Sequence, residues 1–210
     1  MKRSLDCMKR FFKYIKSIQD IIRKQVRWWQ IIVLYLMQIA VFQVMQHVTF
    51  PVIEKNLGTL KIFDMTKQGY GLADAYEIID RMGTEGIHMY LHVQMPLDFL
   101  YPVLMAVVYC LVLVKTSTKP RYSYVLVPGF LVLLDWSENL CIIRMLAERA
   151  FSTGLVRFSS FCTCAKAVVG DYILYFATLF GIAVCLLRWV NDRFSIFTRI
   201  HTLYKKEKQS

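Results

Sequence analysis

The sequence predicts an all-α membrane protein: a four-transmembrane-helix bundle with an N-terminal amphipathic interfacial helix and an outer helical cap between spans one and two. Two observations predict this fold. The 210 residues are 56% hydrophobic, with a mean hydropathy of +0.40, which is more apolar than an ordinary soluble domain. The apolar residues also gather in four long runs that are apolar on all sides, whereas a soluble helix has one apolar stripe.

Each of the four runs is long enough to cross a bilayer. The predicted spans cover approximately residues 29–50, 96–114, 122–143 and 167–189, within a membrane domain of residues 28–190. A helix of about 20 residues crosses the roughly 30 Å hydrocarbon core. Residues 1–27 form a basic amphipathic segment with apolar residues at steps of three and four, which we expect to lie on the membrane surface. Residues 191–210 form a basic tail.

The segment between the first and second spans has structure of its own. Gly69-Tyr70-Gly71 predicts a turn, and apolar residues then recur at helical spacing from Leu72 to Met82. We expect this helix to end at Gly83. Thr84 is then expected to cap a further helix that runs into the second span. The segment is therefore predicted to cap the bundle on its outer side.

The positions of the basic residues favour an orientation with both termini in the cytoplasm. Of the 26 Lys and Arg residues, nine precede residue 28, three lie in the 115–121 loop and six follow Leu187. Cytoplasmic segments are enriched in Lys and Arg, the positive-inside rule. This topology, together with binding of anionic lipid headgroups, accounts for the net charge of +11. We therefore expect membrane lipids as partners and no nucleic acid, while the oligomeric state stays open.

Polar residues inside the predicted spans form the candidate site, because such groups are costly in hydrocarbon. Asp135, Glu138 and Asn139 are three and four residues apart and share one helix face, which must look into the bundle. All four spans place polar groups in the outer half of the bilayer. The candidate ligand-binding residues are Asp98, Tyr101, Asp135, Trp136, Glu138, Asn139, Asp171 and His47.

This pattern leaves several functions open. An acidic pocket that opens outward would bind or transport a small amphiphilic or cationic ligand. Paired carboxylates would instead suit acid–base work in an intramembrane lipid-modifying enzyme. A structural or partner subunit would use the polar groups to hold helices together, with Arg144 and Lys166 neutralising two of the carboxylates. We favour binding over catalysis and assign no catalytic residue.

Other chemistries have weaker support in the sequence. His88 and His92 are one helical turn apart but have no clear third metal ligand. The six cysteines show neither a redox C-x-x-C motif nor a zinc spacing, and no phosphate loop or dinucleotide fingerprint is present. We therefore expect no metal site and no cofactor.

Several short motifs follow one another along the chain: Phe63-Asp64-Met65, Gly69-Tyr70, Tyr90…Asp98…Tyr101-Pro102 and Asp135-x-x-Glu138-Asn139. In this order of motifs, over roughly residues 30–190, the chain resembles a family of small bacterial four-helix membrane proteins without an established function. The resemblance implies the four-span architecture and transfers no catalytic residue. We expect the membrane to be a bacterial plasma membrane. A fainter likeness to the sterol-isomerase and sigma-2-receptor type of four-span bundle implies, by analogy, acidic residues that face a lipid-like ligand.

Overall fold

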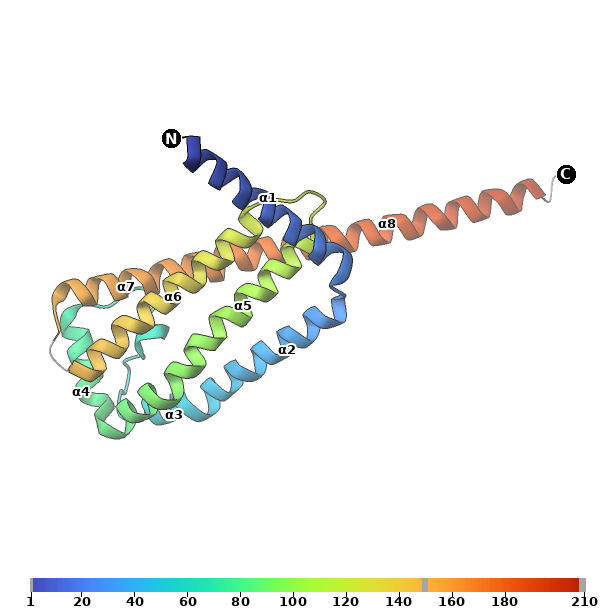
Figure 1. Cartoon of the computed structure of the whole chain (residues 1–210). Coiled ribbons are helices and arrows are strands. Elements are labelled where there is room, and N and C mark those ends of the chain that lie inside the picture. The colour runs from blue at the N-terminus through green and yellow to red at the C-terminus, as the bar shows by residue number, and fades with distance from the viewer. Residues whose placement is uncertain (1, 149–150, 208–210) are drawn as a thin grey trace.

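The computed structural model describes residues 2–148 and 151–207, with side chains at residues 10–148 and 151–191. The described residues form helices and connecting segments without a β-strand (Figure 1). Four helical stretches among them are long and apolar enough to cross a membrane: Trp28–Ile53, Leu72–Thr116, Ser123–Glu148 and Thr153–Asn191. The predicted all-α, four-helix bundle is therefore confirmed, and the chain is an integral membrane protein.

The first stretch consists of three helical segments in line. α2 (Trp28–Val44) continues through a π-helical turn, η1 (Met45–Thr49), into α3 (Phe50–Ile53). Pro51 lies in the first turn of α3, directly after the π-helical turn. Phe50 and Ile53 belong to the buried core, whereas most apolar side chains of α2 are exposed.

The segment after α3 forms the cap, and we call this end of the bundle the cap end. An extended segment with one 3₁₀ turn, η2 (Phe63–Met65), leads into α4 (Leu72–Met89). Gly83 interrupts α4 with φ 65° and ψ −178°, at the residue where the sequence predicts a helix end. Glycine adopts this positive φ without the steric penalty that a Cβ atom would bring. The cap therefore contains two short helical pieces with different directions.

The second and third spans form the centre of the bundle. η3 (Tyr90–Gln94) joins α4 to α5 (Met95–Thr116), and α6 (Ser123–Glu148) returns beside α5. α7 (Thr153–Ala167) packs against α6 on another side, as Figure 1 shows. Because α6 has neighbours on two sides, it can bury a polar face between them.

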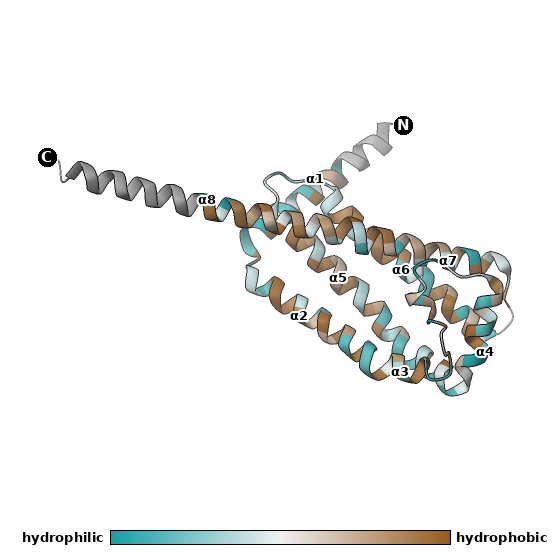
Figure 2. Ribbon diagram, turned by 180° about the vertical axis from the view of Figure 1, so that it is seen from behind, coloured by the Kyte–Doolittle hydropathy of each residue, from teal (hydrophilic) through white to brown (hydrophobic). Residues whose placement is uncertain are grey.

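The last stretch leaves the bundle. α7 continues through the π-helical segment η4 (Val168–Leu174) into α8 (Tyr175–Glu207). α8 packs against α5 and then extends past the bundle, so the segment predicted as a basic tail is helical as far as Glu207 (Figure 1). The part of α8 within the stretch long enough to cross a membrane, which ends at Asn191, is largely hydrophobic (Figure 2). Most of its hydrophobic side chains are exposed.

α1 (Lys2–Gln25) crosses the other end of the bundle, which we call the α1 end (Figure 1). Two of its side chains attach it to the spans. Gln19 Nε2 donates to the carbonyl oxygen of Arg121 at 2.9 Å, and Arg23 Nε donates to that of Val114 at 3.3 Å. α1 is therefore fixed to α5 and to the α5–α6 connection, in addition to having the amphipathic character predicted from its sequence.

Packing is unequal at the two ends. The largest buried cluster lies at the cap end, where α3, the extended segment, α4 and the nearby parts of α5, α6 and α7 meet. The buried cluster near the α1 end is smaller and consists of Ile31, Val108 and Val112. The α2 and α8 walls are therefore held mainly through α5 and leave space between them.

Candidate ligand-binding site

α6 turns its polar residues into the bundle, as the sequence predicts. Glu138 and Asn139 are fully buried, and Asp135 is 8% exposed. Leu133 and Leu140, which lie on the opposite face of the same helix, are exposed. A lipid-facing leucine needs no hydrogen-bond partner, whereas a carboxylate does, so the helix orients itself with its apolar face outward.

The carboxylates of this face surround one lysine. Lys166 Nζ, from the last turn of α7, lies 2.5 Å from Glu138 Oε2 and 2.9 Å from Asp135 Oδ1. It also lies 3.2 Å from Oδ1 of Asp64, which η2 brings in from the cap. The Lys166 side chain is 15% exposed. Buried charges are tolerated when they are paired and hydrogen-bonded, as they are here. This Lys166 cluster therefore joins three separate elements of the fold, α7, α6 and η2.

Hydroxyl groups complete the cluster. The phenol of Tyr90, fully buried in η3, donates to Asp64, and the hydroxyl of Thr163 donates to Glu138. Beside them, the Tyr70 hydroxyl lies 2.6 Å from the Ser159 Oγ. Burial raises the pKa of the Tyr70 phenol well above its ordinary range, although the hydrogen bond to Ser159 opposes the shift. The Lys166 cluster thus has most of its polar atoms paired.

Asp98 differs from the other carboxylates. It lies in the first turn of α5, is 5% exposed, and its backbone oxygen accepts a 3.1 Å hydrogen bond from Asn139 Nδ2. Its Oδ2 atom, however, has no hydrogen-bond partner among the described residues. A buried carboxylate oxygen without a donor is costly, and native structures contain few of them. The Oδ2 atom of Asp98 can therefore accept a hydrogen bond from a further donor, as can Asn139 Oδ1, which is also without a partner among the described residues.

Asp98 lines a cavity of about 250 Å³, which we call the acidic cavity. Six charged residues line it. The four acidic ones are Asp64, Asp98, Asp135 and Asp171, and the two basic ones are Lys67 and Lys166. Lys67 donates to Asp171, and both side chains of this ion pair are half exposed or more. With Glu138 also engaged by Lys166, the described charges of this region have a negative excess.

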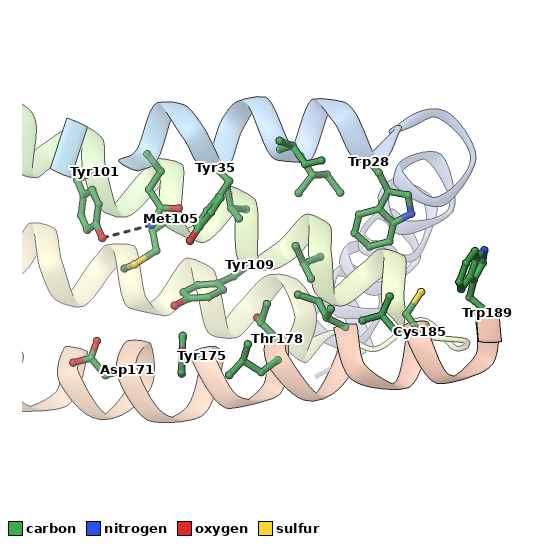
Figure 3. Close-up of a pocket in the computed structure, with 18 residues that line it drawn as sticks. Trp28, Tyr35, Tyr101, Met105, Tyr109, Asp171, Tyr175, Thr178, Cys185 and Trp189 are labelled. Atoms are coloured by element: carbon green, nitrogen blue, oxygen red, sulfur yellow. Dashed lines mark hydrogen bonds between the residues drawn. The ribbon is translucent and has the colours of Figure 1, made fainter. Parts of the chain in front are cut away.

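A larger apolar groove adjoins the acidic cavity. It has a volume of about 870 Å³ and runs between α2, α5 and the η4–α8 helix. Figure 3 shows Tyr101 and Asp171 at one end, Trp28 and Trp189 at the other, and Tyr35, Tyr109 and Tyr175 between them. Tyr101, Met105 and Asp171 line both spaces, so the groove and the acidic cavity adjoin at these three residues.

The predicted site residues fall into two groups. The structure brings together Asp98, Tyr101, Asp135, Glu138, Asn139 and Asp171 at or beside the acidic cavity. Trp136 and His47 are exposed and line neither space. Position 136 falls on the lipid-facing side of α6, where the Trp136 indole donates to the Phe99 carbonyl oxygen at 3.1 Å. Arg144 pairs with Glu148 on the surface rather than with the cluster.

Three important residues were not predicted as site members: Asp64, Lys67 and Lys166. Lys166 had a sequence signal, since it is a basic residue at a helix end within reach of the carboxylates. Asp64 and Lys67 are in the cap, whose path back over the spans does not follow from periodicity. His88 and His92 stack with ring centroids 4.2 Å apart, and no group of three or more metal-ligating side chains occurs in the described part of the chain.

Comparisons with protein-family models, curated proteins and solved structures found no match to this chain. The class of protein therefore rests on the fold and the site themselves. The chain is an integral membrane protein with a four-helix bundle that encloses a buried ionic cluster and, next to it, an acidic cavity and an apolar groove.

Proposed function

We propose that this protein binds a membrane amphiphile, with its positively charged or hydrogen-bond-donating group in the acidic cavity and its apolar chain in the groove. The observation that carries this proposal is that the two spaces adjoin, with Tyr101, Met105 and Asp171 in the lining of both. An amphiphile has the same division of chemistry, one polar end and one apolar chain, along its length.

The charge of the acidic cavity favours a cation. Four carboxylates and two lysines line it, and Lys166 is already shared among three carboxylates. In a site of low polarity, an excess of one charge sign attracts the opposite sign strongly and repels anions. The free Oδ2 of Asp98 adds an acceptor that a cationic or donor group would satisfy.

The dimensions of the groove suit a long apolar chain. Asp171 and Trp189 are 18 positions apart on the η4–α8 helix, so the groove extends for about 27 Å at 1.5 Å per residue. This approaches the roughly 30 Å thickness of a hydrocarbon core. Aromatic rings line it along its whole length and provide flat apolar walls.

We also propose that the membrane is a bacterial plasma membrane, that both termini lie in the cytoplasm and that the acidic cavity lies in the outer half of the bilayer. The distribution of Lys and Arg along the chain supports this orientation. Protease digestion of sealed inverted vesicles tests it: a C-terminal tag should be cleaved there and protected in right-side-out vesicles. The opposite pattern would reverse the orientation.

Binding is tested with purified protein in lipid nanodiscs, titrated with hexadecylamine and with hexadecyl sulfate. We expect hexadecylamine to bind at least about tenfold more tightly, because one charge-assisted hydrogen bond accounts for a factor of that size. Asp98→Asn should weaken amine binding, whereas Glu148→Gln, which removes a carboxylate outside the cavity, should leave it unchanged. Equal binding of both compounds would contradict the proposal.

A structural role is the second candidate, and the Lys166 cluster favours it for part of the site. Lys166 bridges η2 and α6 from α7, so its first effect is to hold these elements together. If the whole polar region were structural, Asp98→Asn would lower stability as much as a change at Lys166. If the acidic cavity binds a ligand, Asp98→Asn would affect binding and leave stability nearly unchanged.

A further inference from the structure

The structure contains two lysines in acidic surroundings, and they differ in how firmly they are held. Lys166 contacts three carboxylates and is 15% exposed. Among the ion pairs of the described residues, Lys67 takes part in one, with Asp171, and the Lys67 side chain is 61% exposed. Exposed ion pairs contribute little to stability, so the Lys67 ammonium leaves its partner at small cost.

The position of the Lys67–Asp171 pair is unusual. Asp171 lines both the acidic cavity and the apolar groove, and Lys67 lines the acidic cavity. The Lys67 side chain therefore places a primary alkylammonium group at the junction of the two spaces. A chain with the same head and a longer apolar tail would present the same chemistry to Asp171 and continue into the groove.

The backbone around Lys67 is fixed, so exchange at Asp171 involves the side chain alone. Phe63 and Tyr70, on either side of it, are buried in the core of the cap end. The Tyr70 backbone N–H donates to Ser160 Oγ at 2.9 Å, and the Gly69 N–H donates to the Thr66 carbonyl oxygen at 2.8 Å. These contacts hold the segment while a four-carbon side chain on it swings away.

Asp98 supplies the independent sign that a further donor is missing. Its carboxylate is 5% exposed, lines the same acidic cavity and leaves Oδ2 without a hydrogen-bond partner among the described residues. A primary ammonium has three N–H donors, whereas a quaternary ammonium has none. A head with several donors would satisfy Asp98 as well as Asp171, and a quaternary head would satisfy neither by hydrogen bonding.

We propose that the amphiphile carries a primary alkylammonium head, that this head replaces the Lys67 side chain on Asp171, and that Asp98 accepts a hydrogen bond from it. Lys67 is then a tethered competitor that occupies the site until the ligand arrives. This inference rests on the proposed function and narrows it to one class of ligand, a long-chain primary amine.

The experiment measures binding of hexadecylamine and hexadecyltrimethylammonium to the full-length protein in nanodiscs. Wild type is compared with Lys67→Gln, Asp171→Asn and the double variant, and Lys61→Gln is the matched control, since Lys61 is an exposed lysine of the same segment outside the cavity lining. The three changed positions, Lys61, Lys67 and Asp171, all have exposed side chains, and thermal melting verifies that each of the four variants is folded.

We expect Lys67→Gln to tighten hexadecylamine binding by about three- to tenfold and Lys61→Gln to leave it unchanged, because one competing ion pair has been removed. Asp171→Asn should weaken binding by about tenfold, and the double variant should behave like Asp171→Asn. Wild type should prefer the primary amine to the quaternary one, and Lys67→Gln should increase that preference.

Two results would overturn this inference: an unchanged affinity in Lys67→Gln, or an equal gain for the quaternary ammonium, which would indicate a general charge effect. Either result would leave the proposed function intact, provided that wild type still binds cationic chains better than hexadecyl sulfate. Failure of both cationic compounds to bind better than the sulfate would instead remove the proposed function itself.

Discussion

At the cap end, Lys166 is enclosed by three carboxylates and by a closely packed apolar core, whereas toward the α1 end α2 and α8 stand on either side of an open groove. Both regions belong to the same four-helix bundle and share α5. At the cap end, charged side chains pair with one another and apolar side chains pack against one another. The groove exposes its aromatic and aliphatic walls, so it needs material from outside the chain, either bulk lipid or a particular ligand. The acidic cavity lies where the two regions meet.

The largest loss of stability is expected when the centre of the cap end is removed. Lys166→Met should lower the free energy of unfolding by about 3–5 kcal/mol, because it leaves buried carboxylates without their cation. Lys67→Met, which removes an exposed lysine, should change it by less than about 0.5 kcal/mol. Unfolding in a mixed-micelle SDS titration measures both. Equal stability of the two variants would show that Lys166 does not organise the cap end.

A matched pair of leucine truncations tests the difference in packing. Leu146, in α6, is 2% exposed in the core of the cap end, and Leu179, in α8, is 45% exposed on the groove wall. Leu146→Ala should cost about 2 kcal/mol or more, because it leaves a cavity in a packed core. Leu179→Ala should cost less than about 1 kcal/mol, because lipid fills the space. The same SDS titration distinguishes them, and similar losses would contradict the unequal packing.

The junction between the two regions should separate binding from stability. Asp98→Asn keeps the shape of the side chain and the backbone contact to Asn139, and it replaces a carboxyl group whose Oδ2 has no partner among the described residues. The free energy of unfolding should therefore change by less than about 1 kcal/mol. Amine binding should fall in the same preparation. A loss of stability comparable to that of Lys166→Met would assign Asp98 to the structural cluster instead.

Tyr70 contributes modestly to stability, and its contribution depends on pH. Tyr70→Phe removes the hydrogen bond to Ser159 and should cost about 1 kcal/mol at pH 7. Because burial raises the pKa of the phenol in the folded protein, its contribution is complete below the unfolded-state pKa of about 10 and is lost as the pH rises above that value. The stability of wild type should therefore fall toward that of Tyr70→Phe in alkaline buffer. A constant difference between pH 7 and pH 11 would contradict this account.

The sequence predicts the bundle well because its signals are local. Long apolar runs, the polar face of Asp135, Glu138 and Asn139, and the break at Gly83 each depend on residues within a few turns. The cluster at Lys166 could be predicted in part, since a basic residue near buried carboxylates has an evident partner. Asp64 and Lys67 reach the site only through the tertiary path of the cap, which no periodic pattern specifies.

The apolar groove could not be predicted either, and for a different reason. The hydrophobic residues of a transmembrane helix face lipid or protein with similar ease, so an apolar run does not reveal which sides are packed. Only the arrangement of α2 and α8 around α5 shows that the walls stay apart. Trp136 illustrates the same limit: it directly follows the buried Asp135, yet its side chain is exposed on the outer face of α6.

The central claim is that one amphiphile occupies the acidic cavity and the groove together. The most direct measurement is photo-cross-linking with a hexadecylamine analogue that carries a diazirine at the far end of its chain, followed by mass-spectrometric mapping. We expect labelling of α2 and α8 at the Trp28–Trp189 end of the groove, and weaker labelling there in Asp98→Asn. Labelling spread equally over lipid-facing residues such as Leu133 and Leu140 of α6, and unaffected by Asp98→Asn, would contradict it.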